Sequence, residues 1–221
     1  MAGLSSTQIA SAALVLLGQN PIADITDTSV PNAVKANAQY DLQRQALLRE
    51  YDWNFARGRE QLQPSATNPA FGWQFAFPVP ADFLRALVVN KNLWPWKLEG
   101  NTILTNGCGG GTNPPSGPDF QTETVTVVCN LVYVRDITQT GLFDPIFTNL
   151  LSIRLAAVLA YPILKDASKS KLMWSLYDDA KGDAKRVSAS EETIKHIEPG
   201  HNATWDRIRG QGDWRGRDWG W

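Results

Sequence analysis

Within Leu47-Leu-Arg-Glu-Tyr-Asp-Trp-Asn-Phe-Ala56, the hydrophobic spacing changes from a helical period to a period of two. Upstream, apolar residues recur at helical spacing from Pro31, which suits the first turn of a helix, to about Tyr51. Downstream, Trp53 and Phe55 alternate with polar neighbours, as in a half-buried strand. The stretch therefore predicts a junction between a helical part and a β-rich part.

The N-terminal quarter predicts two helices that pack as a pair. The first is capped by Ser5 or Ser6, stops at Gly18, and carries Ile9, Ala13, Leu16 and Leu17 at helical spacing. The second has an apolar stripe of Ala33, Tyr40, Leu47 and Tyr51, flanked by Val34 and Leu48. We expect its charged residues, such as Lys35, Arg44 and Glu50, to lie outside that stripe.

The middle of the chain predicts a small antiparallel β-region. Trp73, Phe75 and Phe77 form a strand that Pro78 and Pro80 close, and residues 97–104 form a hairpin turning at Gly100-Asn101. The remaining expected elements are a helical turn at Ala81–Arg85, a short strand at Leu87–Val89, a Gly- and Pro-rich surface loop at Gly107–Pro118, and a strand at Thr124–Val134.

Two further helices follow. Asp144-Pro145 is a strong helix start, and that helix is expected to end near Pro162. The last helix begins near Asp166 or Ser168 and carries Leu172, Leu176, Tyr177, Ala180, Ala184 and Val187. The predicted fold class is α+β: residues 1–52 and 143–190 form a helical bundle, residues 53–142 a β-rich insertion, and residues 191–221 an extended C-terminal arm.

Composition and charge exclude several classes of protein. The 221 residues are 43% hydrophobic and 19% charged with a formal net charge of −1, so a core can form, and the basic surface needed to grip nucleic acid is lacking. The apolar stretch Ile9–Leu17 is too short to span a membrane, and we expect no spanning run elsewhere and a soluble protein. Cys108 and Cys129 have no ligand-like spacing and predict two reduced thiols in a protein made in the cytosol.

No catalytic or cofactor-binding constellation is evident. His196 and His201, with Glu198, could bind a metal, but they follow the last predicted helix in a Pro-Gly segment without a fixed geometry. The glycines of 107–111 lack the Lys and Ser or Thr of a phosphate-binding loop. Asp178-Asp179 and Glu191-Glu192 are adjacent pairs whose side chains do not face each other on a helix. We therefore expect a protein that is not an enzyme and that has no cofactor and no metal.

The C-terminal segment is the most informative for function. Trp and Arg dominate binding hot spots, and the last 17 residues hold four of each type. They are Trp205, Arg207, Arg209, Trp214, Arg215, Arg217, Trp219 and Trp221. We interpret this segment as an arm that docks onto a protein partner. Two alternatives stay open: the arm folds back on its own core, or it stacks on single-stranded nucleic acid, which its near-neutral charge disfavours.

Several motifs resemble those of the tail tubular protein A family of bacteriophages, the head-to-tail adaptors of short-tailed phages. They are Leu14-Val-Leu-Leu-Gly-Gln-Asn-Pro-Ile22, Asn37 and Tyr40, Leu47–Ala56, Gly72-Trp73, Pro80-Ala-Asp-Phe-Leu-Arg85, Tyr133-Val134, Phe143-Asp-Pro-Ile-Phe147 and Leu155-Ala-Ala-Val-Leu-Ala160. The resemblance covers about residues 4–187, and the order and spacing of the motifs carry it.

The resemblance implies a virion protein that forms a ring, usually of twelve copies, between the portal protein and the tail nozzle protein, with DNA passing through its channel. It implies that the C-terminal arm reaches onto the portal, so the eight Trp and Arg residues above become candidate portal-binding residues. An alternative function is a carbohydrate-binding protein or hydrolase of a phage tail, in which Trp73, Phe75, Trp94 and Trp96 line a sugar-stacking groove.

Overall fold

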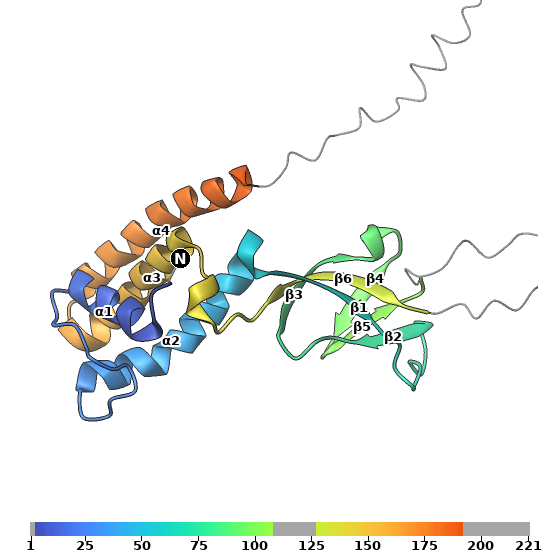
Figure 1. Ribbon diagram of the computed structural model, residues 1–221, viewed down its shortest axis with the longest axis horizontal. Helices are drawn as coiled ribbons and strands as arrows, with labels where there is room; N and C mark the ends of the chain where they lie inside the picture. Colours follow the sequence, from blue (N-terminus) through green and yellow to red (C-terminus); the bar gives the residue numbers. More distant parts are fainter. Residues whose placement is uncertain (1–2, 108–126, 192–221) are drawn as a thin grey trace, which may run out of the picture.

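The computed structural model describes residues 3–107 and 127–191 and has a mixed α+β fold (Figure 1). In space, the four helices of the described residues gather at one end of the molecule and the strands at the other (Figure 1). The helices are α1 (Ser6–Leu16), α2 (Pro31–Glu50), α3 (Pro145–Leu164) and α4 (Ala167–Ser190), with short 3-10 turns η1 (Asn54–Ala56), η2 (Asn90–Asn92) and η3 (Thr140–Leu142). The strands are β1 (Arg57–Leu62), β2 (Phe75–Pro78), β3 (Phe83–Val89), β4 (Trp96–Glu99), β5 (Thr102–Thr105) and β6 (Cys129–Arg135).

Helix α3 is the centre of the helical part, since α1, α2 and α4 all pack against it. Its buried side chains surround the helix and include Phe147, Leu151, Leu155 and Leu159. The helix is long and apolar enough to cross a membrane by length and composition, contrary to the expectation that no such run exists. More than half of its apolar window is buried inside the protein, which is the setting of a core helix.

Caps fix where three helices begin, as the sequence predicts. Ser5 forms a capping box with Gln8, in which each side chain bonds the other residue's backbone N–H. The Asp144 carboxylate accepts a 2.7 Å hydrogen bond from the backbone N–H of Ile146. Asp166 accepts bonds from the backbone N–H groups of Ser168 and Lys169, and two residues lie between the end of α3 and the start of α4.

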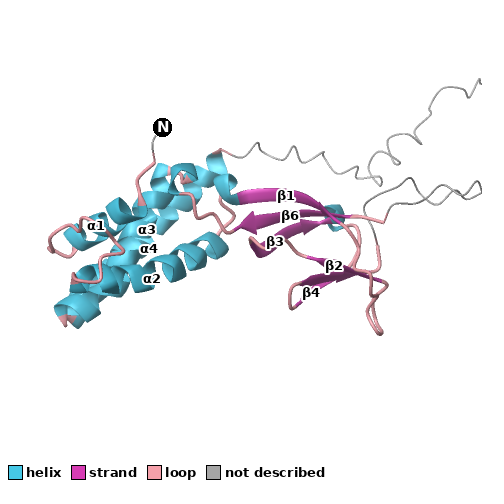
Figure 2. Ribbon diagram, turned by 60° about the horizontal axis from the view of Figure 1, so that its bottom comes forward, coloured by secondary structure: helices cyan, strands magenta, loops and turns pink. Residues whose placement is uncertain are grey.

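The strands form two antiparallel sheets, ordered β1-β6-β3 and β2-β5-β4 (Figure 2). A second hydrophobic core, separate from that of the helices, draws residues from both sheets. Its buried members are Leu62, Phe77, Val89, Ile103, Cys129, Leu131 and Tyr133. The predicted hairpin at residues 97–104 is confirmed: Glu99 pairs with Thr102, and Gly100 turns the chain with a φ of +56°.

The junction differs from its prediction. Trp53 and Phe55 are not strand residues: Asn54–Ala56 forms the turn η1, and the first strand starts at Arg57. Trp53 is buried in the helical core, where its ring packs edge-on against Phe147 with centroids 5.2 Å apart, and its indole N–H donates to the Leu47 carbonyl. The fully buried residues of this segment are Trp53 and Ala56, three positions apart, as the three-residue period of a 3-10 turn requires.

Three other element predictions are wrong in part. Ala81–Arg85 is not a helical turn, because Phe83–Arg85 opens strand β3 and pairs with β6. Helix α3 ends at Leu164, two residues past the expected end near Pro162, and it includes that proline in its last turn. The strand predicted at 124–134 is β6, Cys129–Arg135, and residues 124–126 lie outside the described residues.

The stripes of two helices are also corrected. In α1, Leu16 is exposed and Leu14 is buried instead. In α4 the buried stripe is Met173, Tyr177 and Ala184, with Ala180 partly buried. The predicted core residues Leu172, Leu176 and Val187 lie beside that stripe and are exposed.

Candidate interaction surface

All eight candidate portal-binding residues lie in 192–221, outside the described residues. They are Trp205, Arg207, Arg209, Trp214, Arg215, Arg217, Trp219 and Trp221. The structure does describe the point from which that segment leaves, the end of α4. It also describes the apolar surfaces that surround that point.

The end of α4 is fixed to the junction between α2 and β1. Asn54 donates a 2.7 Å hydrogen bond to the Ser188 carbonyl, and the Tyr51 hydroxyl donates to the Lys185 carbonyl at 3.2 Å. The Ser188 carbonyl lies in the last turn of the helix, where intrahelical donors run out. The position of Glu191, the last described residue, is therefore set by the fold.

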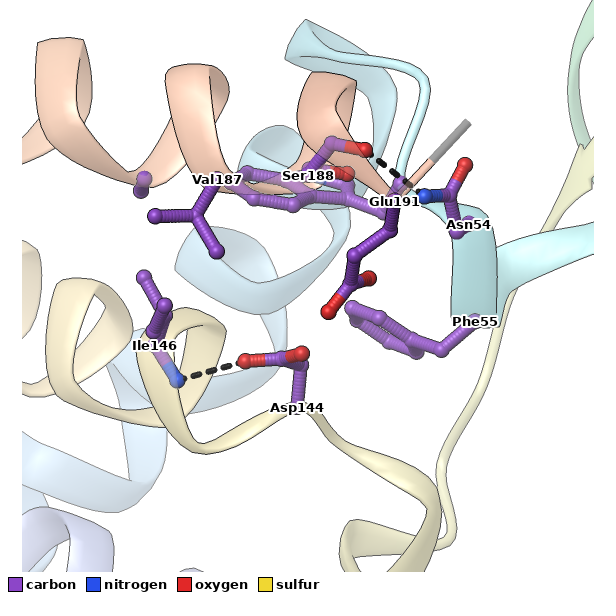
Figure 3. Close-up of a pocket in the computed structure, with 9 residues that line it drawn as sticks. Asn54, Phe55, Asp144, Ile146, Val187, Ser188 and Glu191 are labelled. Carbon is purple, nitrogen blue, oxygen red and sulfur yellow. Dashed lines mark hydrogen bonds between the residues drawn. The ribbon is translucent and has the colours of Figure 1, made fainter. Parts of the chain in front are cut away.

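A small cavity of about 40 Å³ lies between the end of α4, η1 and the start of α3 (Figure 3). In Figure 3 the Glu191 side chain extends from α4 toward Phe55 and Asp144. The Asp144 carboxylate is already engaged in capping Ile146. Among the described residues, no group of three or more His, Cys, Asp or Glu side chains could hold a metal ion.

An ion-pair network holds α4 against α2 and α3. The Glu50 carboxylate accepts hydrogen bonds from Arg154 at 2.8 Å and from the Tyr177 hydroxyl at 2.9 Å, and it also pairs with Lys181. Partial burial raises the pKa of Glu50, but the bonds from Lys181, Tyr177 and Arg154 outweigh it and leave the pKa below its usual value. Burial raises the pKa of Tyr177 to about 12.

Three apolar side chains lie on the outer flank of α4, together with the exposed Asp183. At about 100° per residue, Leu172, Leu176 and Val187 lie on one side of the buried stripe, and Lys181 and Lys185 lie on the other. Lys181 pairs with Glu50, and Lys185 lies over the Tyr51 ring, so the lysine side faces α2. The leucine side therefore faces away from α2, and Leu172 is 50% exposed.

Arg44 ties the helical part to the β-region, and its prediction as a residue outside the apolar stripe is wrong. It is 2% exposed, and its guanidinium donates to the Asp136 carboxylate and, at 2.7 Å, to the Ile137 carbonyl. Gln45 donates to the second Asp136 oxygen at 2.7 Å. Sequence spacing could not reveal this site, because Asp136 lies 92 residues further on.

The four aromatics of the alternative carbohydrate site do not share one groove. Trp73 and Phe71 both line an open groove of about 630 Å³. Phe75 and Trp96 pack against the second hydrophobic core, on the opposite side of the β2-β5-β4 sheet, and Trp94 packs over Gly107. Phe71, which the sequence did not single out, is 89% exposed at this groove.

A scan against protein-family models and a search among curated proteins found no match to this chain. The likeness to the tail tubular protein A family therefore rests on the motifs quoted above.

Proposed function

We propose that this protein is a structural head-to-tail adaptor of a phage virion, with no catalytic activity. It is made in the host cytoplasm and forms a ring, of about twelve copies by the family resemblance, that joins the portal protein to the tail nozzle protein. DNA passes through the channel of the ring. In this proposal the N- and C-terminal helices form one bundle, the β-region is inserted into it, and the C-terminal arm docks onto the portal.

The observation that carries this proposal is the exposed flank of α4, formed by Leu172, Leu176 and Val187. Covering such side chains with another subunit contributes about 25 cal/mol per Å² of apolar surface removed from water. The flank belongs to the helix that leads directly into the Trp- and Arg-rich segment. Tryptophan and arginine side chains concentrated at one end of a chain favour protein–protein docking over small-molecule chemistry.

The test is deletion of residues 200–221. We expect the shortened protein still to unfold in one cooperative thermal transition, because the described cores lie wholly within residues 3–191. It should bind purified portal rings at least tenfold more weakly in a sedimentation or surface-binding assay. A full-length control with His196→Ser and His201→Ser should bind as the parent does; portal binding that survives the deletion removes the arm from the proposal.

The groove beside Phe71 and Trp73 favours a second candidate function, binding of a glycan by a phage tail protein. Exposed aromatic rings stack on the apolar faces of sugars. A glycan array should then show binding that Phe71→Ala and Trp73→Ala abolish and Trp94→Ala leaves unchanged. If the intact protein binds no glycan, the glycan-binding function is excluded and the adaptor function is the one candidate that remains.

A further inference from the structure

A second apolar groove lies on the helical part, between the start of α1 and the start of α3. Its volume is about 500 Å³, within the range of about 300–1,000 Å³ typical of ligand pockets. Its apolar lining comes from Leu4, Ile9, Ala12, Phe143 and Pro145. At one end of the groove the backbones of Gly3 and Gly141 lie close together. A Cβ added to Gly3 would be 2.7 Å from the Cα of Gly141.

The polar rim of the groove is formed by Thr148, Asn149 and Ser152. The Thr148 hydroxyl donates to the Asp144 carbonyl at 3.0 Å, and the Ser152 hydroxyl donates to the Asn149 carbonyl at 2.7 Å. The Asn149 side chain is exposed, and no described residue bonds its amide. An apolar slot with one amide oxygen at its rim suits an indole, whose ring needs burial and whose single N–H needs an acceptor.

The C-terminal segment begins next to this groove. Glu191 and Asp144 line the same small cavity, and the chain neighbours of Asp144, Phe143 and Pro145, line the groove. Trp205 follows Glu191 by 14 residues, which span up to about 45 Å when extended. An intramolecular ligand on so short a tether has an effective concentration on the order of millimolar.

We propose that this groove binds a tryptophan of residues 192–221 of the same chain, so that the C-terminal segment is held on its own subunit before any partner is met. The indole occupies the space between Ala12 and Phe143, and its N–H donates to the Asn149 amide oxygen. Docking of the segment on a partner then requires its release from the groove. The inference does not depend on the adaptor function, since it concerns the isolated chain.

The test uses the full-length protein labelled with 5-fluorotryptophan, with each of the nine fluorine resonances assigned by single Trp→Phe substitutions. We expect one of the four C-terminal resonances to lie away from the position of a solvent-exposed tryptophan. Ala12→Phe, which fills the groove, should return that resonance to the exposed position. Val15→Phe adds the same ring to an exposed position of α1 outside the groove, and should leave it unchanged.

Asn149→Leu provides a second variant, since it keeps the size of the side chain and removes the acceptor. It should shift the same resonance, whether or not Ala12→Phe folds normally. The proposal is overturned if all four C-terminal resonances already lie at the exposed position in the parent protein. It is also overturned if the displaced resonance moves on dilution, because the groove would then be filled by a second copy.

Discussion

At the residue scale, Arg44 shows what a buried charge does in this fold. It lies on the face of α2 that meets the β-region, and besides Asp41 on its own helix its partners are Asp136 and Ile137, in the segment that returns to the helices. Removing one partner of a buried pair leaves the other charge without compensation, which costs more than the pair itself contributes. The side chain therefore fixes how the two parts join.

Replacing this side chain should destabilise the protein strongly. We expect Arg44→Ala to lower the free energy of unfolding by about 3–5 kcal/mol, since Asp136 stays largely buried without its partner. Arg186→Ala is the matched control: Arg186 forms an exposed pair with Asp183, worth less than about 1 kcal/mol. Urea unfolding of both variants measures the difference, and equal losses would contradict the role given to Arg44.

The Glu50 network makes stability depend on pH. The folded-state pKa of Glu50 is depressed, so its contribution is present above the unfolded-state value near 4.5 and is lost as the pH falls through the lower folded-state pKa. We expect Glu50→Gln to lower the unfolding free energy at pH 7 and to cost much less at pH 3. Chemical unfolding of parent and variant at both pH values measures this. A cost independent of pH would show that packing, and not charge, holds α4 at this point.

At the element scale, hydrophobic spacing predicted where the helices lie better than which face of each helix is buried. Capping residues mark the starts of α1, α3 and α4 locally, and Gly100-Asn101 marks the hairpin, so these features could be predicted. The buried face of α4 could not be predicted, because Leu172 and Met173 are adjacent and both apolar, and either could belong to the buried stripe. The choice between them depends on where α3 and α2 lie, which is tertiary information.

Adjacent residues of α4 should therefore behave differently. We expect Met173→Ala to cost about 2–5 kcal/mol of unfolding free energy, since it leaves a cavity in the helical core. Leu172→Ala should cost less than about 1 kcal/mol because the side chain is half exposed. Thermal or urea unfolding of the two variants decides between the stripe of the structure and the one predicted from spacing, which places Leu172 in the core.

At the scale of the whole molecule, the mixed α+β class could be predicted because the hairpin at residues 97–104 and the return to helix at Asp144 are both strong signals. For the candidate site, the sequence could predict only a segment rich in Trp and Arg, without its geometry. Its eight Trp and Arg residues lie outside the described chain, and the groove and the α4 flank depend on contacts among distant segments. The virion setting remains a proposal that rests on the motif resemblance.

At this scale the proposed adaptor function predicts how the protein assembles with the portal. We expect the purified protein, mixed with portal rings, to add to each ring in a fixed whole-number stoichiometry, measurable as an increase in mass by native mass spectrometry. Leu172→Asp combined with Leu176→Asp should reduce that addition while leaving the unfolding temperature within a few degrees of the parent, because both side chains are exposed. Unchanged loading by this variant would exclude the α4 flank from the assembly interface.

The central position of α3 has a consequence for how the protein is made. Helices α1 and α2 leave the ribosome first, but the helix that covers their apolar faces follows only after all six strands. At a synthesis rate of about 5–20 residues per second, those faces stay uncovered for several seconds. The core of the β-region needs β6, which is made just before α3, so both hydrophobic cores close only after about two thirds of the chain has been synthesised.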